Sequence, residues 1–156
     1  ESGDNRVLAM NKKEATVEQA RQAVRWAKKA GLSVWGYFML GMYGDDRESM
    51  ERTVRLSLQE PFDIVNFAVS APYPGTEWGR IAEDNGWLVD KRWEAFDQNY
   101  SAQVSQPDCD VELVKRTQRH AYFRWYLSWR GLNFFLKSFK PEYLSYFFNT
   151  VRDHLR

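Results

Sequence analysis

The sequence is poor in the residues that build metal centres and covalent cross-links. Its 156 residues include one cysteine, Cys109, and two histidines, His120 and His154, that are far apart in the chain. A single cysteine excludes an internal disulfide and any multi-cysteine zinc or iron–sulfur site formed by this chain alone. Asp108 and Asp110 flank the thiol and disfavour the thiolate form that a nucleophile requires. We therefore predict a reducing, cytoplasmic setting and no metal or nucleophilic site in this chain.

Long apolar runs are absent as well. The longest, such as residues 34–40, fall far short of the roughly 20 residues that a membrane span requires. The chain opens on Glu1, with neither a methionine nor a signal-peptide pattern. We therefore expect it to be a piece of a longer protein.

A net charge is nearly absent, but the formal value of +1 conceals an asymmetry. Residues 1–114 carry 13 basic and 19 acidic side chains, whereas residues 115–156 carry 9 basic and 2 acidic ones. Residues 122–156 also hold 12 of the 25 aromatic residues. The acidic first part would repel nucleic acid, so nucleic acid is not a predicted partner.

Two cycles of strand, glycine-containing loop and helix occupy the first part of the chain. Thr16 and Gln19 form a capping-box pair, and Gly31 suits a left-handed helix end. The continuous apolar run at 34–40 is typical of a strand buried on both faces. Alternation of this kind predicts parallel strands with right-handed crossovers. The predicted elements are helices at 16–31, 47–59 and 77–85 and strands at 34–40 and 62–70.

The pattern of alternating strands and helices does not continue in the rest of the chain. Residues 98–109 are polar and contain Pro107, which predicts a linker or lid. A helix is predicted for 111–130, ended by Gly131, and a second one is predicted to begin near Pro141 and to continue to about residue 154. We therefore divide the chain into an α/β part at 1–97, a linker at 98–109 and a helical extension at 110–156.

In parallel βα architectures ligands bind at the carboxyl ends of the strands. The loops after Leu40 and Ser70 are therefore the candidate site, and both carry glycines that allow close backbone approach. On spacing alone, an equally good interpretation is that Gly41, Gly44 and Gly75 only form turns. Neither loop has the glycine pattern of a phosphate-binding loop.

Four segments stand out in the first part of the chain: Glu1-Ser2-Gly3, Val7-Leu8 with Met10-Asn11-Lys12, Gly36-Tyr-Phe-Met-Leu-Gly41 and Ala71-Pro-Tyr-Pro-Gly-Thr-Glu77. Their order and spacing resemble the second half of a radical S-adenosylmethionine enzyme core. The resemblance covers residues 1–97 and is closest to the cobalamin-binding group that includes the anaerobic Mg-protoporphyrin IX monomethyl ester oxidative cyclases. It implies the C-terminal half of a partial, TIM-like (β/α) barrel followed by a helical extension.

The resemblance also implies roles for particular residues. Glu1 and Ser2 would contact the ribose and amino-acid part of S-adenosylmethionine, since an ionised carboxylate accepts hydrogen bonds from hydroxyl and ammonium groups. The adenine would pack on the segment that includes Phe38, Leu40 and Gly41, and would receive backbone hydrogen bonds from the edge formed by Ala71, Pro72 and Tyr73. No catalytic residue is predicted within the chain.

Two departures from the family pattern matter. Where the family usually has Gly-Leu-Pro-Gly-Glu-Thr, residues 41–46 read Gly-Met-Tyr-Gly-Asp-Asp, and loss of the proline predicts a softer loop. The CxxxCxxC motif that ligates the [4Fe–4S] cluster is absent. The cluster ligands, and the domain that would bind cobalamin, are therefore expected in an N-terminal part of the same enzyme, and the fragment alone is expected to be inactive.

The basic, aromatic tail at 115–156 admits three interpretations. Its rings pack on the rest of the enzyme or on each other, contact a membrane surface peripherally, or cover a flat apolar substrate such as a tetrapyrrole. We predict part of a radical S-adenosylmethionine oxidoreductase that acts on a small molecule. The alternative is a non-catalytic binding module whose tail docks to a membrane or to a protein partner.

Overall fold

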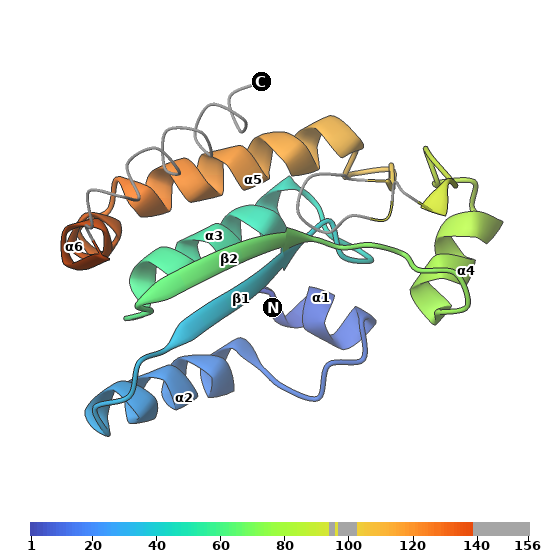
Figure 1. Cartoon of the computed structure of the whole chain (residues 1–156). Coiled ribbons are helices and arrows are strands. Elements are labelled where there is room, and N and C mark those ends of the chain that lie inside the picture. Colours follow the sequence, from blue (N-terminus) through green and yellow to red (C-terminus); the bar gives the residue numbers. More distant parts are fainter. Residues whose placement is uncertain (94–95, 97–102, 139–156) are drawn as a thin grey trace.

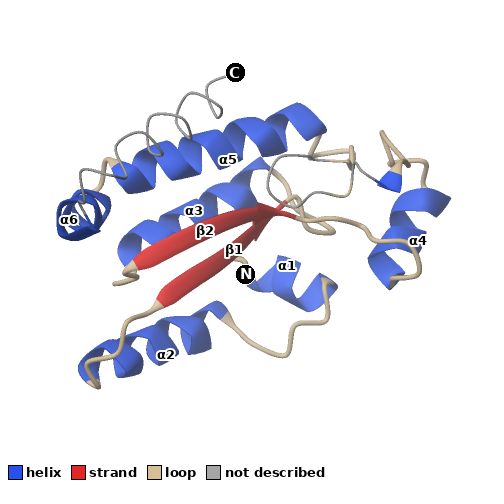
Figure 2. Ribbon diagram, in the orientation of Figure 1, coloured by secondary structure: helices blue, strands red, loops and turns tan. Residues whose placement is uncertain are grey.

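The computed structural model describes residues 1–93, 96 and 103–138, and shows a mixed α/β fold (Figures 1 and 2). Strands β1 and β2 pair in parallel, in a register that runs from Trp35 opposite Ile64 to Leu40 opposite Val69. This confirms the predicted parallel pair. The elements are α1 Asn5–Met10, α2 Val17–Lys29, β1 Trp35–Leu40, α3 Arg47–Gln59, β2 Ile64–Val69, α4 Glu77–Asp84, α5 Val111–Tyr126 and α6 Trp129–Ser138.

Local capping signals fix the ends of the helices. In α2 the Thr16 side chain accepts from the Gln19 N–H, and the Gln19 side chain accepts from the Thr16 N–H, as the capping box predicts. Asp46 caps α3 in the same reciprocal way with Ser49. Gly31 has a φ of +78°, the left-handed conformation expected at a helix end. The predicted helices at 16–31, 47–59 and 77–85 are therefore present.

One face of the sheet forms the core. The rings of Phe38 and Phe67 stack with their centroids 5.5 Å apart, and Phe62 meets Phe38 edge to face. Figure 1 shows α5 running beside β2 and α3, and α5 contacts both of these elements. The core side chains that they contribute include Met50, Val54, Val69, Val114 and Trp125.

The other face of the sheet is open in the described chain, which corrects the prediction that residues 34–40 are buried on both faces. Trp35 and Tyr37 are 57% and 59% exposed, while Gly36, Phe38 and Leu40 are buried. Successive side chains of a strand point to opposite faces. In the described chain, alternate residues of this apolar run are therefore buried against helices, and the others are at least partly exposed.

Side chains of α5 close the outer edge of β2. Gln118 Nε2 donates to the Phe67 carbonyl over 2.7 Å, and the Phe67 N–H donates to the Tyr122 hydroxyl over 3.1 Å. The Tyr122 hydroxyl in turn donates to Asn66 Oδ1 over 2.6 Å. The N–H and carbonyl groups of Phe67, which in a larger sheet would pair with another strand, are thus hydrogen-bonded to side chains of a helix.

The predicted helix at 111–130 is wrong at its C-terminal end. Helix α5 stops at Tyr126, and Gly131 lies inside α6. Ser128 makes the break, because its Oγ donates to the Trp125 carbonyl and accepts from the Gly131 N–H. A Cβ on Gly131 would lie 2.3 Å from the Trp125 carbonyl oxygen, so glycine is needed for close approach and not for ending a helix.

Other sequence predictions are met only in part. The helix expected after Pro141 lies outside the described residues. The sheet has two strands in the described chain, so an α/β fold is established and a half barrel stays a prediction. No helix in the described ranges is long and apolar enough to cross a bilayer.

We predict that Tyr122→Phe lowers the free energy of unfolding by about 1–3 kcal/mol, because it leaves the partly buried Phe67 N–H without an acceptor. Chemical denaturation monitored by circular dichroism measures this loss. Tyr126→Phe is the matched control, since the Tyr126 ring packs beside Tyr122 and no hydrogen bond of its hydroxyl is found in the described chain. Equal stability of the two variants would contradict the edge-closing role of Tyr122.

Candidate functional site

The loops that follow the two strands lie side by side. The Ser70 N–H donates to the Leu40 carbonyl over 2.9 Å, so the backbone pairing reaches the start of both loops. Figure 2 shows both strands ending on the side where α1 and α4 lie. Loops 41–46 and 71–76 therefore form the carboxyl edge of the sheet, where the sequence predicts the site.

Asp45 holds loop 41–46 from within. Its side chain is 3% exposed, its Oδ2 accepts from the Met42 N–H over 2.9 Å, and its Oδ1 accepts from the Ser49 hydroxyl. Burial raises the pKa of the Asp45 carboxyl to about 6, and the hydrogen bonds from Ser49 and Met42 oppose this shift only in part. The loop is thus built around a carboxyl group that changes charge close to neutral pH.

Two amide side chains hold the same loop from outside. Gln106 Oε1 accepts from the Gly44 N–H and its Nε2 donates to the Met42 carbonyl, both over 2.9 Å. Asn11 Nδ2 donates to the Tyr43 carbonyl over 2.9 Å. The loop is therefore anchored by α1, by α3 and by the segment before α5, although it lacks the proline of the family pattern.

Loop 71–76 is fixed by its own turn. The Tyr73 carbonyl accepts from the Thr76 N–H over 3.1 Å and from the Thr76 hydroxyl over 2.7 Å, and Thr76 caps α4. A Cβ on Gly79 would lie 2.3 Å from the Tyr73 carbonyl oxygen, so α4 packs directly against this turn. Tyr73 also stacks on Phe96, with the ring centroids 5.8 Å apart.

Aromatic rings connect the two loops. The centroid of the Tyr43 ring lies 5.3 Å from that of Trp78 in α4 and 6.4 Å from that of Trp87. Beside them, Lys12 pairs with Glu77 over 2.6 Å and so joins α1 to the start of α4. The two loops are thereby held at a fixed separation.

The segment at Glu1 and Ser2 joins this edge. The Met39 N–H donates to the Glu1 carbonyl over 2.8 Å, and the Glu1 carboxylate pairs with Lys13 over 2.8 Å. Ser2 is buried; its hydroxyl accepts from the Asp4 N–H and lies 3.4 Å from the Thr53 hydroxyl. The structure places the Glu1 backbone beside the end of β1, pairs its carboxylate with Lys13 and keeps Ser2 buried.

The remaining predicted site residues divide in the same way. The side chains of Phe38, Leu40 and Pro72 are buried, so they can shape the edge but present only backbone to a ligand. Gly41, with a φ of +75°, and Ala71 lie at the strand ends. Tyr73 is partly exposed. The contacts predicted for these eight residues stay predictions.

Sequence reasoning missed two features of this region. Tyr37 and Met39 belong to the open face of β1, and strand alternation alone could have identified them. Gln106 lies in the segment predicted as a linker, yet it is buried and reaches across to the loop after β1. No local pattern in the sequence indicates this contact.

The thiol of Cys109 is buried near the same loop. Burial, followed by the negative charges of Asp45 and Asp110, raises its pKa to about 12. The thiol is therefore protonated and unreactive at neutral pH. Within the ranges that the structure describes, no group of three or more His, Cys, Asp or Glu side chains could hold a metal ion.

Comparison with known proteins finds enzymes, although no family model matches the chain. It is 30% identical over 127 residues to an uncharacterized methyltransferase of Pyrococcus horikoshii, covering 81% of this chain and 28% of that protein. It is 31% identical over 94 residues to a probable threonylcarbamoyladenosine tRNA methylthiotransferase of Pyrococcus abyssi, covering 59% and 22%. It is 26% identical over 123 residues to an anaerobic magnesium-protoporphyrin IX monomethyl ester cyclase of Rubrivivax gelatinosus, covering 78% and 21%.

The chain thus spans only 21 to 28% of the length of these curated relatives. Their names describe a methyltransferase, a methylthiotransferase and a cyclase. The similarity supports membership of an enzyme family, and it covers more than three quarters of the chain in two of the three alignments.

We predict that Asp45→Asn changes how stability depends on pH. Because the folded state holds the Asp45 proton more tightly, the contribution of this group is fully present below pH 3.8 and is lost as the pH rises through about 6. The variant, which lacks this loss, should gain about 3 kcal/mol relative to the wild type between acidic and neutral pH. Urea denaturation across that range measures the difference.

The control for this experiment is Asp84→Asn, which changes an exposed carboxylate in α4. Its stability relative to the wild type should stay constant over the same pH range. A flat difference for Asp45→Asn as well would show that the buried carboxyl does not titrate in this window.

Proposed function

We propose that this chain is part of a radical S-adenosylmethionine enzyme and contributes the adenine and ribose side of the S-adenosylmethionine site. One observation carries the proposal. Glu1, Gly41 and Ala71, taken from three of the four family segments, lie at the ends of three neighbouring backbone segments, joined by the hydrogen bonds from Met39 to Glu1 and from Ser70 to Leu40.

The chemistry of this edge fits the proposed ligand. The Glu1 carboxylate can accept hydrogen bonds from ribose hydroxyls or from an ammonium group, and its partner Lys13 lies at the surface and can be displaced. Backbone at Gly41 and Ala71 can approach a flat base closely, and the exposed part of the Tyr73 ring can pack against it. The role of these residues would be to bind and orient, while the cofactors carry the difficult chemistry.

The described residues do not fit an iron–sulfur cluster. The chain has one cysteine, which is buried and protonated at neutral pH, whereas such clusters are held by several thiolates. We propose that the ligands of a [4Fe–4S] cluster, and any cobalamin-binding domain, lie in an N-terminal part of the same protein. The finer assignment, an oxidoreductase acting on a tetrapyrrole, is favoured by the alignments with two anaerobic magnesium-protoporphyrin IX monomethyl ester cyclases.

The open side of the sheet supports such a missing part. Trp35 and Tyr37 are more than half exposed, and strand alternation directs their backbone groups to the same edge at which Met39 pairs with Glu1. Large apolar side chains beside an open strand edge normally contact another segment. We propose that upstream strands of the same protein cover this face and this edge.

In the complete protein that contains these residues, Glu1→Gln should weaken S-adenosylmethionine binding about tenfold, the loss expected when a charge-assisted hydrogen bond is removed. Glu14→Gln is the control, because Glu14 is an exposed carboxylate in the segment between α1 and α2. Isothermal titration measures binding, and release of 5′-deoxyadenosine under reducing conditions reports the reaction. Unchanged affinity in Glu1→Gln would remove that residue from the site, and an upstream sequence without a CxxxCxxC motif would end the proposal.

The alternative function, a module that docks to a membrane, has one specific observation in its favour. Trp129 and Leu136 in α6 are 81% and 70% exposed, and Phe123 and Leu127 nearby are also mostly exposed. These apolar side chains belong to the part of the chain that is rich in basic residues. Aromatic residues combined with basic ones favour the interface of anionic lipids.

We predict for this alternative that the double variant Trp129→Ser, Leu136→Ser binds vesicles of phosphatidylcholine and phosphatidylserine about tenfold more weakly than the wild type. Co-sedimentation measures binding. Trp26→Ser is the control, since Trp26 in α2 is 67% exposed but lies outside this segment. No binding by the wild type, or an equal loss in the control, would exclude docking through α6.

A further inference from the structure

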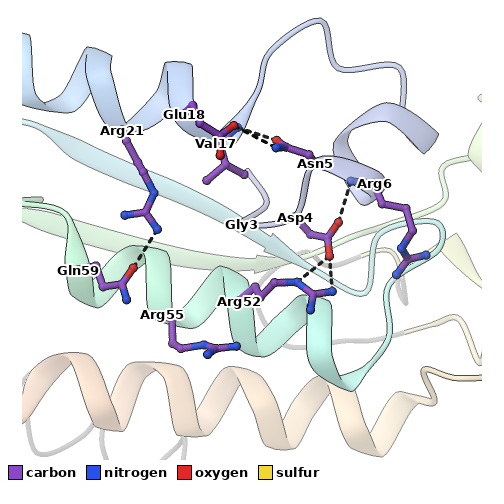
Figure 3. A pocket seen from close by; sticks show the side chains of 10 residues that line it. All are labelled: Gly3, Asp4, Asn5, Arg6, Val17, Glu18, Arg21, Arg52, Arg55 and Gln59. Atoms are coloured by element: carbon purple, nitrogen blue, oxygen red, sulfur yellow. Dashed lines mark hydrogen bonds and ion pairs between the residues drawn. The ribbon is translucent and has the colours of Figure 1, made fainter.

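A polar cavity of about 450 Å³ lies between α1, α2 and α3 (Figure 3). Its volume falls in the range of small-molecule sites, roughly 300–1,000 Å³. The charged groups that line it comprise four guanidinium groups and two carboxylates, so the lining has an excess of positive charge. They are Arg6, Arg21, Arg52, Arg55, Asp4 and Glu18.

Buried carboxylates hold two of these arginines in place. Arg52 donates through Nε to Asp4 Oδ2 over 2.8 Å, and Asp4, which is 7% exposed, also caps α1. Arg21 pairs with Glu60 over 2.5 Å, and Glu60 is 3% exposed. Arg6, at the rim, pairs with Asp46 over 2.7 Å. The walls of the cavity are therefore fixed by ion pairs before any ligand arrives.

Arg55 differs from its neighbours. It lies on the same stripe of α3 as Arg52 and Gln59, and Figure 3 shows it between them. Among the described residues it has no hydrogen-bond or ion-pair partner. Within the described chain the N–H donors of its guanidinium group are therefore available, beside the hydrogen-bonded pair of Arg21 and Gln59.

Gln59 supplies a second donor on the same wall. Its Oε1 accepts from Arg21 over 2.8 Å, which orients the amide so that its NH2 group points away from Arg21. Arg55 and Gln59 lie one turn apart on α3. The guanidinium group of Arg55 and the NH2 group of Gln59 can therefore donate hydrogen bonds to the same ligand. Neighbouring donors on one wall, in a lining with an excess of positive charge, suit an oxyanion.

We propose that this cavity binds a small organic anion whose phosphate or carboxylate group is held by Arg55. The planar guanidinium group matches both oxyanions in a two-point hydrogen bond. The volume exceeds that of a single phosphate, so the rest of the ligand occupies the space towards Asn5 and Glu18, where polar side chains favour a hydroxylated molecule. None of the residues that line this cavity is among those proposed to contact S-adenosylmethionine at the strand ends.

Titration of the full chain with ribose 5-phosphate tests the proposal. Ribose 5-phosphate should bind the wild type, Arg55→Gln should weaken the binding about tenfold, and Arg80→Gln should leave it unchanged. Arg80 is the matched control because it is an exposed arginine in α4 without a hydrogen-bonded partner in the described chain. No binding by the wild type, equal affinity of Arg55→Gln, or an equal loss in Arg80→Gln would overturn the proposal.

Two further probes identify the chemistry. Tighter binding of ribose 5-phosphate than of inorganic phosphate supports a role for the rest of the cavity, whereas equal binding would overturn the claim of an organic ligand. Malonate compares carboxylate with phosphate, and the tighter of the two anions identifies the group that Arg55 recognises. Circular dichroism melting of each variant checks that the fold is retained, which we expect because Arg55 has no hydrogen bond or ion pair among the described residues.

Discussion

A pair of parallel strands is stable only when its edges and faces are covered, and this constraint organises the described chain. Helices α3 and α5 cover one face, and the side chains of Gln118 and Tyr122 close the edge of β2. The opposite face is open in the described chain, and the edge of β1 carries the hydrogen bond from the Met39 N–H to the Glu1 carbonyl. The proposed site lies at the carboxyl ends of the two strands, next to the open edge of β1.

The same C-terminal segment that closes the sheet also shapes the site. Gln106 reaches the loop after β1, and α5 begins a few residues later with Val114 against Gly41. Asp45 completes the arrangement from inside the loop. The geometry of the strand ends therefore depends on residues more than 60 positions further along the chain. A substitution near the start of α5 would therefore alter the conformation of the loop after β1.

Local features of the fold could be predicted from the sequence, and long-range ones could not. Helix starts at Thr16 and Asp46 depend on hydrogen bonds within four residues, so their patterns are explicit in the chain. The exposure of Trp35 was missed because an apolar strand sequence does not indicate which segments, if any, pack on each of its faces. Gly131 was misread because a glycine serves a helix end and a close approach equally well. The hydrogen bonds of Gln106 and Tyr122 join residues more than 50 positions apart, so no local sequence pattern predicts them.

The closed edge of β2 limits how copies of this chain could associate. Because side chains of α5 satisfy the backbone of Phe67, β1 offers the more accessible edge for a second strand within the described chain. A sheet that adds strands at one edge cannot grow in two directions. Two copies pairing through β1 would consume both open edges and form a closed twofold dimer, so edge pairing would stop at two chains and would not propagate into a fibre.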